Sequence, residues 1–356
     1  MSLIAKIDCD RFISNIKAIK SKVRTNIIAV VKADAYGHGA SVLAPVAEPF
    51  IDGFAVIDRR EATALVKEGI TKPIHILSPC ERVEGNFWTE NMIPTICCLR
   101  DIEQLRKLKP LSRLVNLEIN TGMNRLGVAP SEVQQAYERI LLADFKLHSV
   151  FSHLYNAVDV KSSFEQLAIF HSSTANLPKN IQKHISATAS VNLPEQFYLN
   201  AIRPGLGLYG YGASDIVKPI MTVTAPIIKI FSVKKGEHIS YGNFTADKDV
   251  LIASIRAGYA DGIRRKENPL STNRKVKVNG VLCPIVGQVC MDITMVDITG
   301  VKASYSTPVV IMGEGLSAED VARQVGTNSY EVLTSFKGRV VREYVYNAHC
   351  TKINVQ

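Results

Sequence analysis

The run Asn26-Ile27-Ile28-Ala29-Val30-Val31 is apolar from its second residue to its last, and Lys32 follows it directly. An apolar run without polar alternation is typical of a strand that is buried on both faces of a sheet. Further apolar runs lie at 54–57, 74–77, 95–98, 114–119 and 148–151, with weaker ones at 184–186 and 201–202. Helical patterns separate several of them, at 61–67, 101–108, 131–142 and 164–175. About eight strands that alternate with helices predict an α/β barrel of the TIM-type (β/α)8 class, with an open doubly wound sheet as the alternative.

The pattern changes near residue 220. Residues 221–231 begin a series of β-type segments that glycine or asparagine separates, and 276–282 carries the Asn-Gly pair of a hairpin turn. Within this region one stretch, 317–325, has a helical pattern. We therefore expect a barrel domain at 9–220, followed by a mainly-β C-terminal domain at 221–356.

The composition is that of a globular protein. Of 356 residues, 46% are hydrophobic and 21% charged, and no apolar run approaches the roughly 18 residues that span a bilayer. The first residues become charged too soon for a signal peptide, so we expect a cytoplasmic protein with no membrane partner. Seven cysteines without C-x-x-C spacing indicate reduced thiols and no structural metal.

Lysine and arginine outnumber the acidic residues by 42 to 33, which gives a net charge of +9. Such an excess is found in proteins that bind nucleic acid or a phosphorylated small molecule. Here the basic residues are scattered in short clusters, such as 264–266 and 275–277, and no nucleic-acid-binding motif accompanies them. We therefore expect a solvated basic surface and no nucleic-acid partner.

Functional groups of a parallel barrel gather at the carboxyl ends of its strands. Lys32 stands at such an end, where desolvation lowers the pKa of the amine and lets it attack a carbonyl; the alternative is a surface lysine. Arg125 and Arg203 also follow predicted strands, although either alone fits a surface arginine. Residues 205–210 match G-x-G-x-x-G, but β-rich sequence follows, which favours a phosphate-binding turn over a Rossmann unit. Together these groups predict a pocket for an anionic ligand.

Five segments, in consistent order along the chain, resemble the alanine racemases, pyridoxal-phosphate (PLP) enzymes that interconvert L- and D-alanine. They are residues 29–39, 121–128, 203–211, 258–262 and 284–292. The resemblance implies PLP as cofactor, alanine as substrate and a head-to-tail homodimer whose active sites combine both subunits. It also implies that a strand at 1–8 joins the C-terminal β domain, and that the physiological role is D-alanine supply for peptidoglycan.

The resemblance assigns the catalytic roles to Lys32, which would bind PLP covalently, and to Tyr241 of the partner subunit. Racemisation takes a proton from one face of a planar carbon and returns one to the other face, so two opposed bases suit it better than one. Taken alone, a tyrosine beside glycine, such as Tyr241 or Tyr259, is more often a packing or turn residue.

The resemblance also places Arg203 opposite the pyridine nitrogen of PLP. A permanent cation there disfavours protonation of the ring and limits side reactions such as transamination. His153 would support this arginine, although alone it would fit an ordinary core histidine.

The remaining implied contacts fall into three groups. The phosphate would be held by Tyr36, Thr188 and the backbone N–H groups of Gly205 and Leu206. The substrate carboxylate would meet Arg125 and the backbone of Met291. Tyr259 would lie near the entrance, and Asp292 beside the site.

The chain departs from the family pattern at three positions. Thr188 replaces a frequent serine and keeps the hydroxyl, whereas Gly338 replaces a tyrosine that contacts the phosphate, which puts that contact and the entrance shape in doubt. Glu118 stands where many members have a lysine that is carboxylated to an anion. Our hypothesis is that Glu118 supplies the negative charge directly and pairs with Arg125; the alternative is a solvated glutamate at a strand end.

Three alternative functions compete with alanine racemisation. The same fold could act on serine or on a wider range of amino acids, because an apolar pocket discriminates a methylene or hydroxyl only modestly. A non-catalytic PLP-binding barrel protein would have no need of the large β domain that carries Tyr241. A PLP barrel decarboxylase would be distinguished by release of carbon dioxide.

Overall fold

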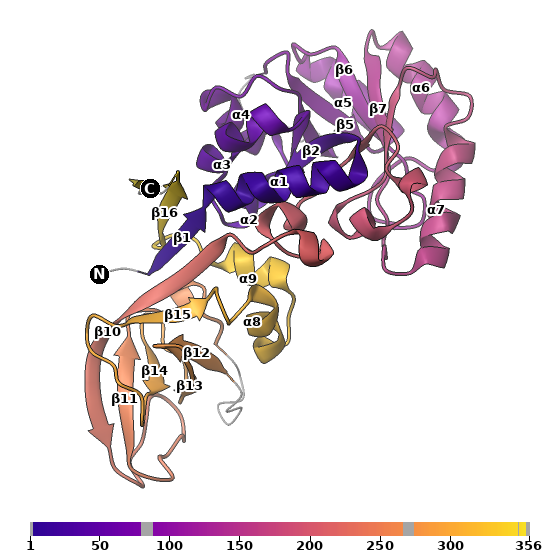
Figure 1. Cartoon of the computed structure of the whole chain (residues 1–356). Helices are drawn as coiled ribbons and strands as arrows, with labels where there is room; N and C mark the ends of the chain where they lie inside the picture. Colours follow the sequence, from indigo (N-terminus) through magenta and orange to yellow (C-terminus); the bar gives the residue numbers. More distant parts are fainter. Residues whose placement is uncertain (1–2, 80–87, 266–273, 348, 354–356) are drawn as a thin grey trace. The chain divides into compact units, whose positions relative to one another are not determined.

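A computed structural model describes residues 3–79, 88–265, 274–347 and 349–353 of the chain. Contacts between residues divide the chain into two compact units (Figure 1). The barrel unit comprises Arg11–Lys218, and the β unit comprises Met1–Asp10 together with Pro219–Gln356. Among the described residues, no helix is both long and apolar enough to cross a membrane.

The barrel unit contains an eight-stranded parallel sheet whose strands follow one another in sequence order. They are β2 (Asn26–Val30), β3 (Gly53–Val56), β4 (Ile74–Pro79), β5 (Met92–Ile96), β6 (Leu114–Glu118), β7 (Lys146–Phe151), β8 (Gln182–His184) and β9 (Ala201–Ile202). β9 pairs with β2, and a bridge between Ala187 and Arg203 joins the segments after β8 and β9, so the sheet nearly closes. The expected TIM-type barrel is therefore confirmed, and each strand overlaps one of the predicted apolar runs.

Helices connect these strands (Figure 1). They are α1 (Cys9–Val23), α3 (Ala40–Ala47), α4 (Arg59–Lys67), α5 (Leu99–Leu108), α6 (Val133–Leu142) and α7 (Val160–Ser173), together with α2 (Lys32–Tyr36), described below with the site. α4 and α7 begin after Asp58 and Asp159, whose carboxylates accept backbone N–H groups of the first turn. The sequence patterns did not predict α1 or α3, and α3 contains Pro45 and lacks a polar face.

The β unit contains a nine-stranded sheet and confirms the predicted mainly-β domain. Its strands are β1 (Ile4–Asp8), β10 (Met221–Val233), β11 (Val250–Ile255), β12 (Lys275–Val278), β13 (Val281–Val286), β14 (Thr294–Asp297), β15 (Pro308–Met312), β16 (Val341–Tyr346) and β17 (His349–Ile353). β1 pairs antiparallel with β10 and parallel with β16. β12 and β13 form the predicted hairpin, with Asn279 and Gly280 at positive φ in its turn. Helix α8 (Ala318–Val325) was predicted, and α9 (Ser329–Ser335) was not.

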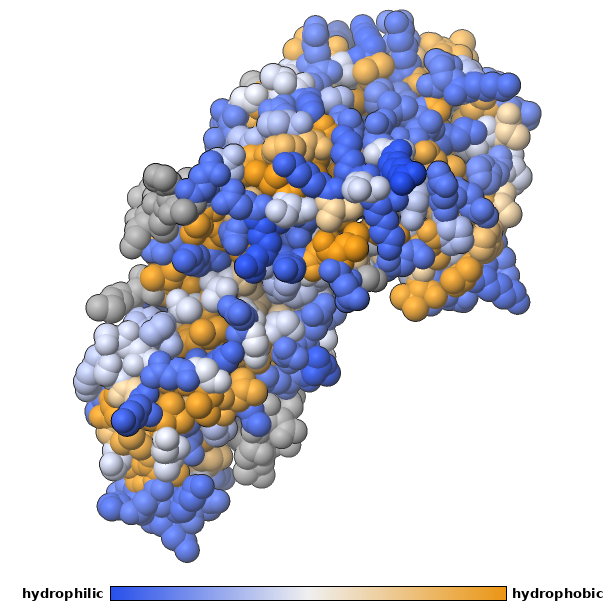
Figure 2. All heavy atoms as spheres, in the orientation of Figure 1, coloured by the Kyte–Doolittle hydropathy of each residue, from blue (hydrophilic) through white to orange (hydrophobic). Residues whose placement is uncertain are grey.

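Each unit has a hydrophobic core of its own. In the β unit, one cluster is formed by residues such as Val233, Ile252 and Met295. On the face of the barrel unit drawn in Figure 2, hydrophobic residues are scattered among hydrophilic ones. The barrel strands also bury polar side chains: Asn116 and Ser149 are fully buried. These polar groups need hydrogen-bond partners inside the barrel, since burial without a partner is costly.

Candidate active site

Lys32 lies directly after β2, where the backbone forms an unusual turn. Helix α2 is left-handed, because Ala33, Asp34, Ala35 and Tyr36 all have φ between 52° and 55°. L-residues adopt this conformation at a cost of roughly 1–2 kcal/mol each, so the surrounding structure must stabilise the turn. The turn thereby places Lys32 and Tyr36 in one short segment at the carboxyl end of the barrel.

Glu61, on helix α4, supports the Lys32 turn. Its carboxylate accepts the N–H of Ala33 at 2.7 Å and that of Ile57 at 2.9 Å, which ties the turn to the chain after β3. Burial lowers the pKa of the Lys32 amine, the charge of Arg125 lowers it further, and Glu61 opposes this shift. A lysine in this setting releases its proton more readily, so it can act as a nucleophile or as a base.

Arg203 is a buried cation just after β9, and its side chain is held from several directions. Its guanidinium is in hydrogen-bond contact with His184 Nδ1 and donates to the carbonyls of His184, at 3.2 Å, and of Ser152. The guanidinium carbon also lies 4.9 Å from the centre of the Phe151 ring. Burial lowers the pKa of Arg203 to about 10, so this residue remains a cation at neutral pH.

His153, the residue expected to support Arg203, lies in the same unit and is half-buried. Burial lowers the pKa of His153 to about 3, and the charge of Arg203 contributes to this shift, so the imidazole is neutral at pH 7. The hydrogen bonds described for the Arg203 guanidinium are made with Ser152 and His184. A supporting role for His153 therefore stays a prediction.

Glu118 is the last residue of β6, and Arg125 lies in the loop that follows it. The Glu118 carboxylate is 6% exposed and accepts a hydrogen bond from Cys97 Sγ at 3.4 Å. Burial raises the pKa of Glu118, while the thiol and the charges of Arg203 and Arg125 lower it. Between the described Glu118 and Arg125 side chains no ion pair forms, so their direct pairing stays a hypothesis. The carboxylate is held by the thiol and is influenced by both arginine charges.

Hydroxyl and backbone groups converge at the turn after Arg203. Thr188 Oγ1 accepts the N–H of Gly205 at 3.1 Å and that of Gly207 at 3.0 Å. A Cβ at Gly205 would overlap the Tyr36 hydroxyl, so glycine lets the Tyr36 side chain approach this turn closely. Leu206 begins the short helix η5 (Leu206–Tyr209) and is buried. The structure therefore brings the predicted phosphate-binding residues Tyr36, Thr188, Gly205 and Leu206 together.

The groups of the barrel unit fit PLP. The close approach at Gly205 forms a cradle with hydroxyl and backbone groups, which suits a phosphate. The amine of Lys32, with its lowered pKa, suits an aldehyde. The buried Arg203 guanidinium supplies a fixed donor for an unprotonated ring nitrogen.

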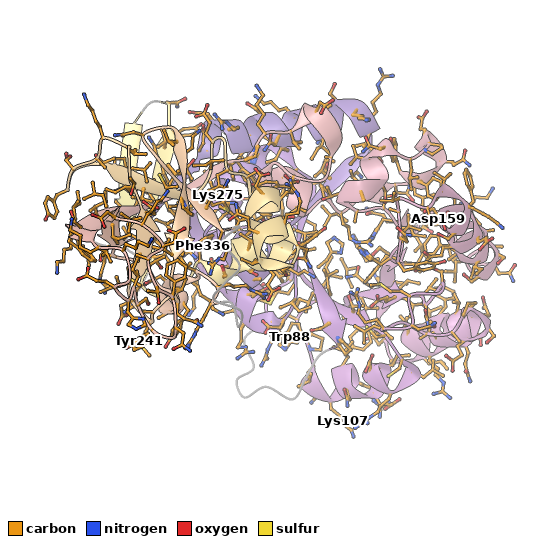
Figure 3. All side chains as sticks on the ribbon, turned by 90° about the horizontal axis from the view of Figure 1, so that it is seen from below. Trp88, Lys107, Asp159, Tyr241, Lys275 and Phe336 are labelled. Carbon is orange, nitrogen blue, oxygen red and sulfur yellow. The ribbon has the colours of Figure 1, made fainter. Side chains whose placement is uncertain are left out.

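The predicted residues of the β unit include Tyr241, which is 67% exposed. Figure 3 shows Tyr241 at the edge of this unit. Its neighbour Ser240 has a left-handed backbone, with φ 66°, and donates its hydroxyl hydrogen to the carbonyl of Gln288 at 2.6 Å. This bond ties the Tyr241 loop to the segment that leads to Met291.

Backbone hydrogen bonds join that segment to the turn that contains Tyr259. The N–H of Tyr259 donates to the carbonyl of Cys290, and the N–H of Ala260 donates to that of Met291, both at 3.0 Å. A Cβ at Gly258 would overlap the carbonyl of Met291, so this contact also requires glycine. The β unit therefore brings the loops of Tyr241, Tyr259 and Met291 together.

Arg339 holds Asp292 beside the loops of Tyr259 and Met291. The guanidinium of Arg339 lies 2.7 Å from Asp292 Oδ1 and 3.0 Å from Asp261 Oδ1, and so links two loops. The preceding residue, Gly338, has a φ of 68°, and no atom of the described residues lies within 4 Å of the position a Cβ would take. The position where the family pattern expects a tyrosine is therefore open in this unit.

Three residues at the site were missed by the sequence analysis: Glu61, Cys97 and His184. Their partners Ala33, Glu118 and Arg203 lie 28, 21 and 19 residues away in the sequence. No local spacing reveals such contacts. The available signal was a polar residue within or beside a predicted strand, as at His184, because buried polar groups require partners.

Two family models match the chain: alanine racemase, N-terminal domain, at residues 7–213, and alanine racemase, C-terminal domain, at residues 220–344. The alanine racemase of Thermodesulfovibrio yellowstonii is 38% identical over 96% of this chain and 98% of its own length. That of Haemophilus influenzae is 35% identical over 96% and 98%.

Solved structures agree with these matches. An alanine racemase of Clostridium difficile has a TM-score of 0.89 at 31% identity, and the match covers 99% of this chain and 98% of that one. An alanine racemase of Bartonella henselae with covalently bound pyridoxal phosphate has a TM-score of 0.87 at 28% identity, covering 97% and 100%. With both domain models matched in order and relatives aligned over nearly the whole length, the chain belongs to the alanine racemase family.

Proposed function

We propose that this chain is a PLP-dependent racemase that interconverts L- and D-alanine. The observation that carries the proposal is the Lys32 amine, whose pKa is lowered by burial and by Arg125, in the same unit as the buried Arg203. The choice of alanine as the substrate rests on the alanine racemases to which the chain is similar. When bound, PLP takes up the electron pair that remains at Cα after its proton leaves.

Each end of the cofactor has a set of residues proposed to hold it. Lys32 would bind its aldehyde, and Thr188, Tyr36 and the turn at 205–206 would hold its phosphate. Arg203 would face the ring nitrogen. Its charge persists at neutral pH because burial lowers its pKa only to about 10, and a cation there opposes ring protonation.

We assign the two proton-transfer roles to Lys32 and to Tyr241 of a second copy of the chain. Lys32 would exchange the proton on one face of the substrate, and the tyrosine hydroxyl would exchange it on the other. The exposure of Tyr241 and its grouping with the Met291 loop support this assignment. Arg125 and the Met291 backbone would bind the substrate carboxylate. The enzyme would be a homodimer with shared active sites.

The wider setting follows from the same proposal. Cys9, Cys97, Cys98, Cys283 and Cys290 are free thiols, which supports a reducing, cytoplasmic location. We place the barrel domain at 9–220 and the β domain at 221–356 with strand 1–8. The product D-alanine would serve peptidoglycan synthesis.

The test of activity is D-alanine formation from L-alanine in the presence of PLP. We expect Lys32→Ala and Tyr241→Phe to abolish or strongly reduce it, and Tyr305→Phe, which alters another exposed tyrosine of the same unit, to leave it unchanged. Serine is assayed in parallel, because the open position at Gly338 would admit a larger substrate. Bound PLP without racemisation by the parent protein would refute the proposal.

Mixing the two inactive variants tests the shared site. If each site combines Lys32 of one copy with Tyr241 of the other, a hybrid dimer of Lys32→Ala and Tyr241→Phe keeps one intact site. An equal mixture should then recover about a quarter of the parent activity after subunit exchange. If both residues of a site came from one copy, every site would lack one of them, and the mixture would stay inactive.

A further inference from the structure

A continuous chain of hydrogen bonds runs from Arg203 into the barrel. Arg203 contacts His184 Nδ1; His184 Nε2 lies 3.1 Å from Ser149 Oγ; and Ser149 Oγ lies 2.7 Å from Asn116 Oδ1. His75 Nδ1 also reaches Asn116 Oδ1, at 3.2 Å. All five side chains are at most 4% exposed. The chain thus crosses strands β4, β6, β7 and β8 away from solvent.

The amide of Asn116 can face only one way. Its Nδ2 donates to the backbone carbonyl of Ile93 at 3.2 Å, and a carbonyl can only accept. A flipped amide would place two oxygens against one another. Oδ1 must therefore face Ser149 and His75, and it accepts from both.

The orientation of Asn116 determines the next two links. The Ser149 hydroxyl has one hydrogen, which it donates to Asn116 Oδ1, so toward His184 its oxygen can only accept. His184 must then carry its hydrogen on Nε2. Burial lowers the pKa of His184 well below its usual value, so the ring is neutral and Nδ1 has a free lone pair for the Arg203 guanidinium.

The two ends of the hydrogen-bond network require the same arrangement. The carbonyl of Ile93 can only accept a hydrogen bond, and the guanidinium of Arg203 can only donate one. Every hydrogen bond between them then has a donor and an acceptor in one direction only. A His184 ring with its hydrogen on Nδ1 would bring an N–H against the N–H of Arg203. We propose that Ser149 and Asn116 are positioning residues for Arg203: they present the Nδ1 lone pair of His184 to the guanidinium and so hold it toward the cofactor.

The first test uses the protein without cofactor, labelled with ¹⁵N-histidine. The imidazole nitrogen shifts of His184, assigned by comparison with His184→Gln, should show the Nε2–H form between about pH 5.5 and 8.5. An Nδ1–H or charged ring in the parent protein would overturn the proposal without any variant. In Ser149→Ala, the Nε2–H proton should lose its acceptor and exchange faster with solvent. Ser149→Thr should restore its protection.

The second test measures racemisation and rests on the proposed function. Ser149→Ala should lower kcat by about tenfold, the order expected when a positioning group loses one buried hydrogen bond, and leave KM for alanine unchanged. Ser163→Ala is the matched control, because it removes another fully buried hydroxyl, on α7. If Ser149→Ala and Ser163→Ala behave alike in both tests, the network does not position Arg203. If the parent shows the Nε2–H form but does not racemise alanine, the proposed function fails and the network stands.

Discussion

Thr188→Val should destabilise the barrel unit strongly for a change of almost no volume. Thr188 is 4% exposed, and its hydroxyl oxygen accepts two backbone N–H groups, those of Gly205 and Gly207. Valine fills the same space and leaves both groups without an acceptor. A buried donor that loses its partner costs about 1–3 kcal/mol, so for two donors we expect the free energy of unfolding to fall by about 2–6 kcal/mol.

Trp88 provides the assay. It is the single tryptophan of the chain, lies in the barrel unit and is 4% exposed, so its fluorescence during urea unfolding reports on this unit. Thr188→Ser is the matched control, because it keeps the hydroxyl and loses one methyl group, at a cost of about 1 kcal/mol. PLP should also bind more weakly to Thr188→Val than to Thr188→Ser.

The comparison between the two variants decides the matter. If Thr188→Val is no less stable than Thr188→Ser, the hydroxyl does not anchor the turn at 205–207. The reasoning that makes this turn the phosphate site would then be refuted.

Three further predictions concern charged groups. Arg125→Gln should raise the pKa of Lys32, because a neighbouring positive charge is removed. The reaction of the Lys32 amine with trinitrobenzenesulfonate, in the protein without PLP, should therefore shift to higher pH. An unchanged pH dependence would contradict this prediction. Glu118→Gln should be more stable than the parent at about pH 8 and equal to it at low pH. Burial raises the pKa of the Glu118 carboxyl in the folded state, so its contribution to stability is complete below the pKa of the unfolded state and is lost as pH rises through the pKa of the folded state. Urea unfolding that is equal for variant and parent at both pH values would argue against this. Unchanged kcat and KM for alanine in Glu118→Gln would remove the proposed role of Glu118 toward Arg125. Arg339→Gln should lower the melting temperature of the β unit, and more at low salt than at high salt, because the partly exposed arginine pairs with the buried Asp261. Thermal unfolding followed by circular dichroism without a salt-dependent difference would count against the pair.

The barrel could be predicted because its strands are buried on both faces. Continuous apolar runs such as 27–31 and 54–57 mark such strands directly. The hairpin at 276–282 was equally accessible, because Asn279 and Gly280 are the residues that its turn requires.

Other elements gave weaker signals. Helix α3 has apolar residues on nearly all sides and a proline inside, so its sequence does not alternate with helical spacing. The left-handed turn at 33–36 consists of alanine, aspartate and tyrosine, whose own preferences do not predict four consecutive residues at positive φ. Tertiary contacts, such as the bond from Ala33 to Glu61, stabilise it instead.

The part of the candidate site that could be predicted consists of residues that follow predicted strands. Lys32, Arg125 and Arg203 all follow strands, and the family resemblance gave them roles. The residues that orient them lie on other strands or helices, as His184 does for Arg203. Their contribution depends on which atom donates and which accepts, and that information exists only once the strands are side by side.

The handedness of the backbone after Lys32 has a consequence for chemical synthesis. Mirror-image chirality reverses the steric preference of a residue, so a D-amino acid at the exposed Ala33 would adopt the observed dihedral angles without the strain of an L-residue. A semisynthetic chain with one such replacement should fold to a more stable barrel unit, by roughly 1–2 kcal/mol. Directly after Lys32, this L-polypeptide thus contains a stretch of main chain in which the opposite configuration would be the better fit.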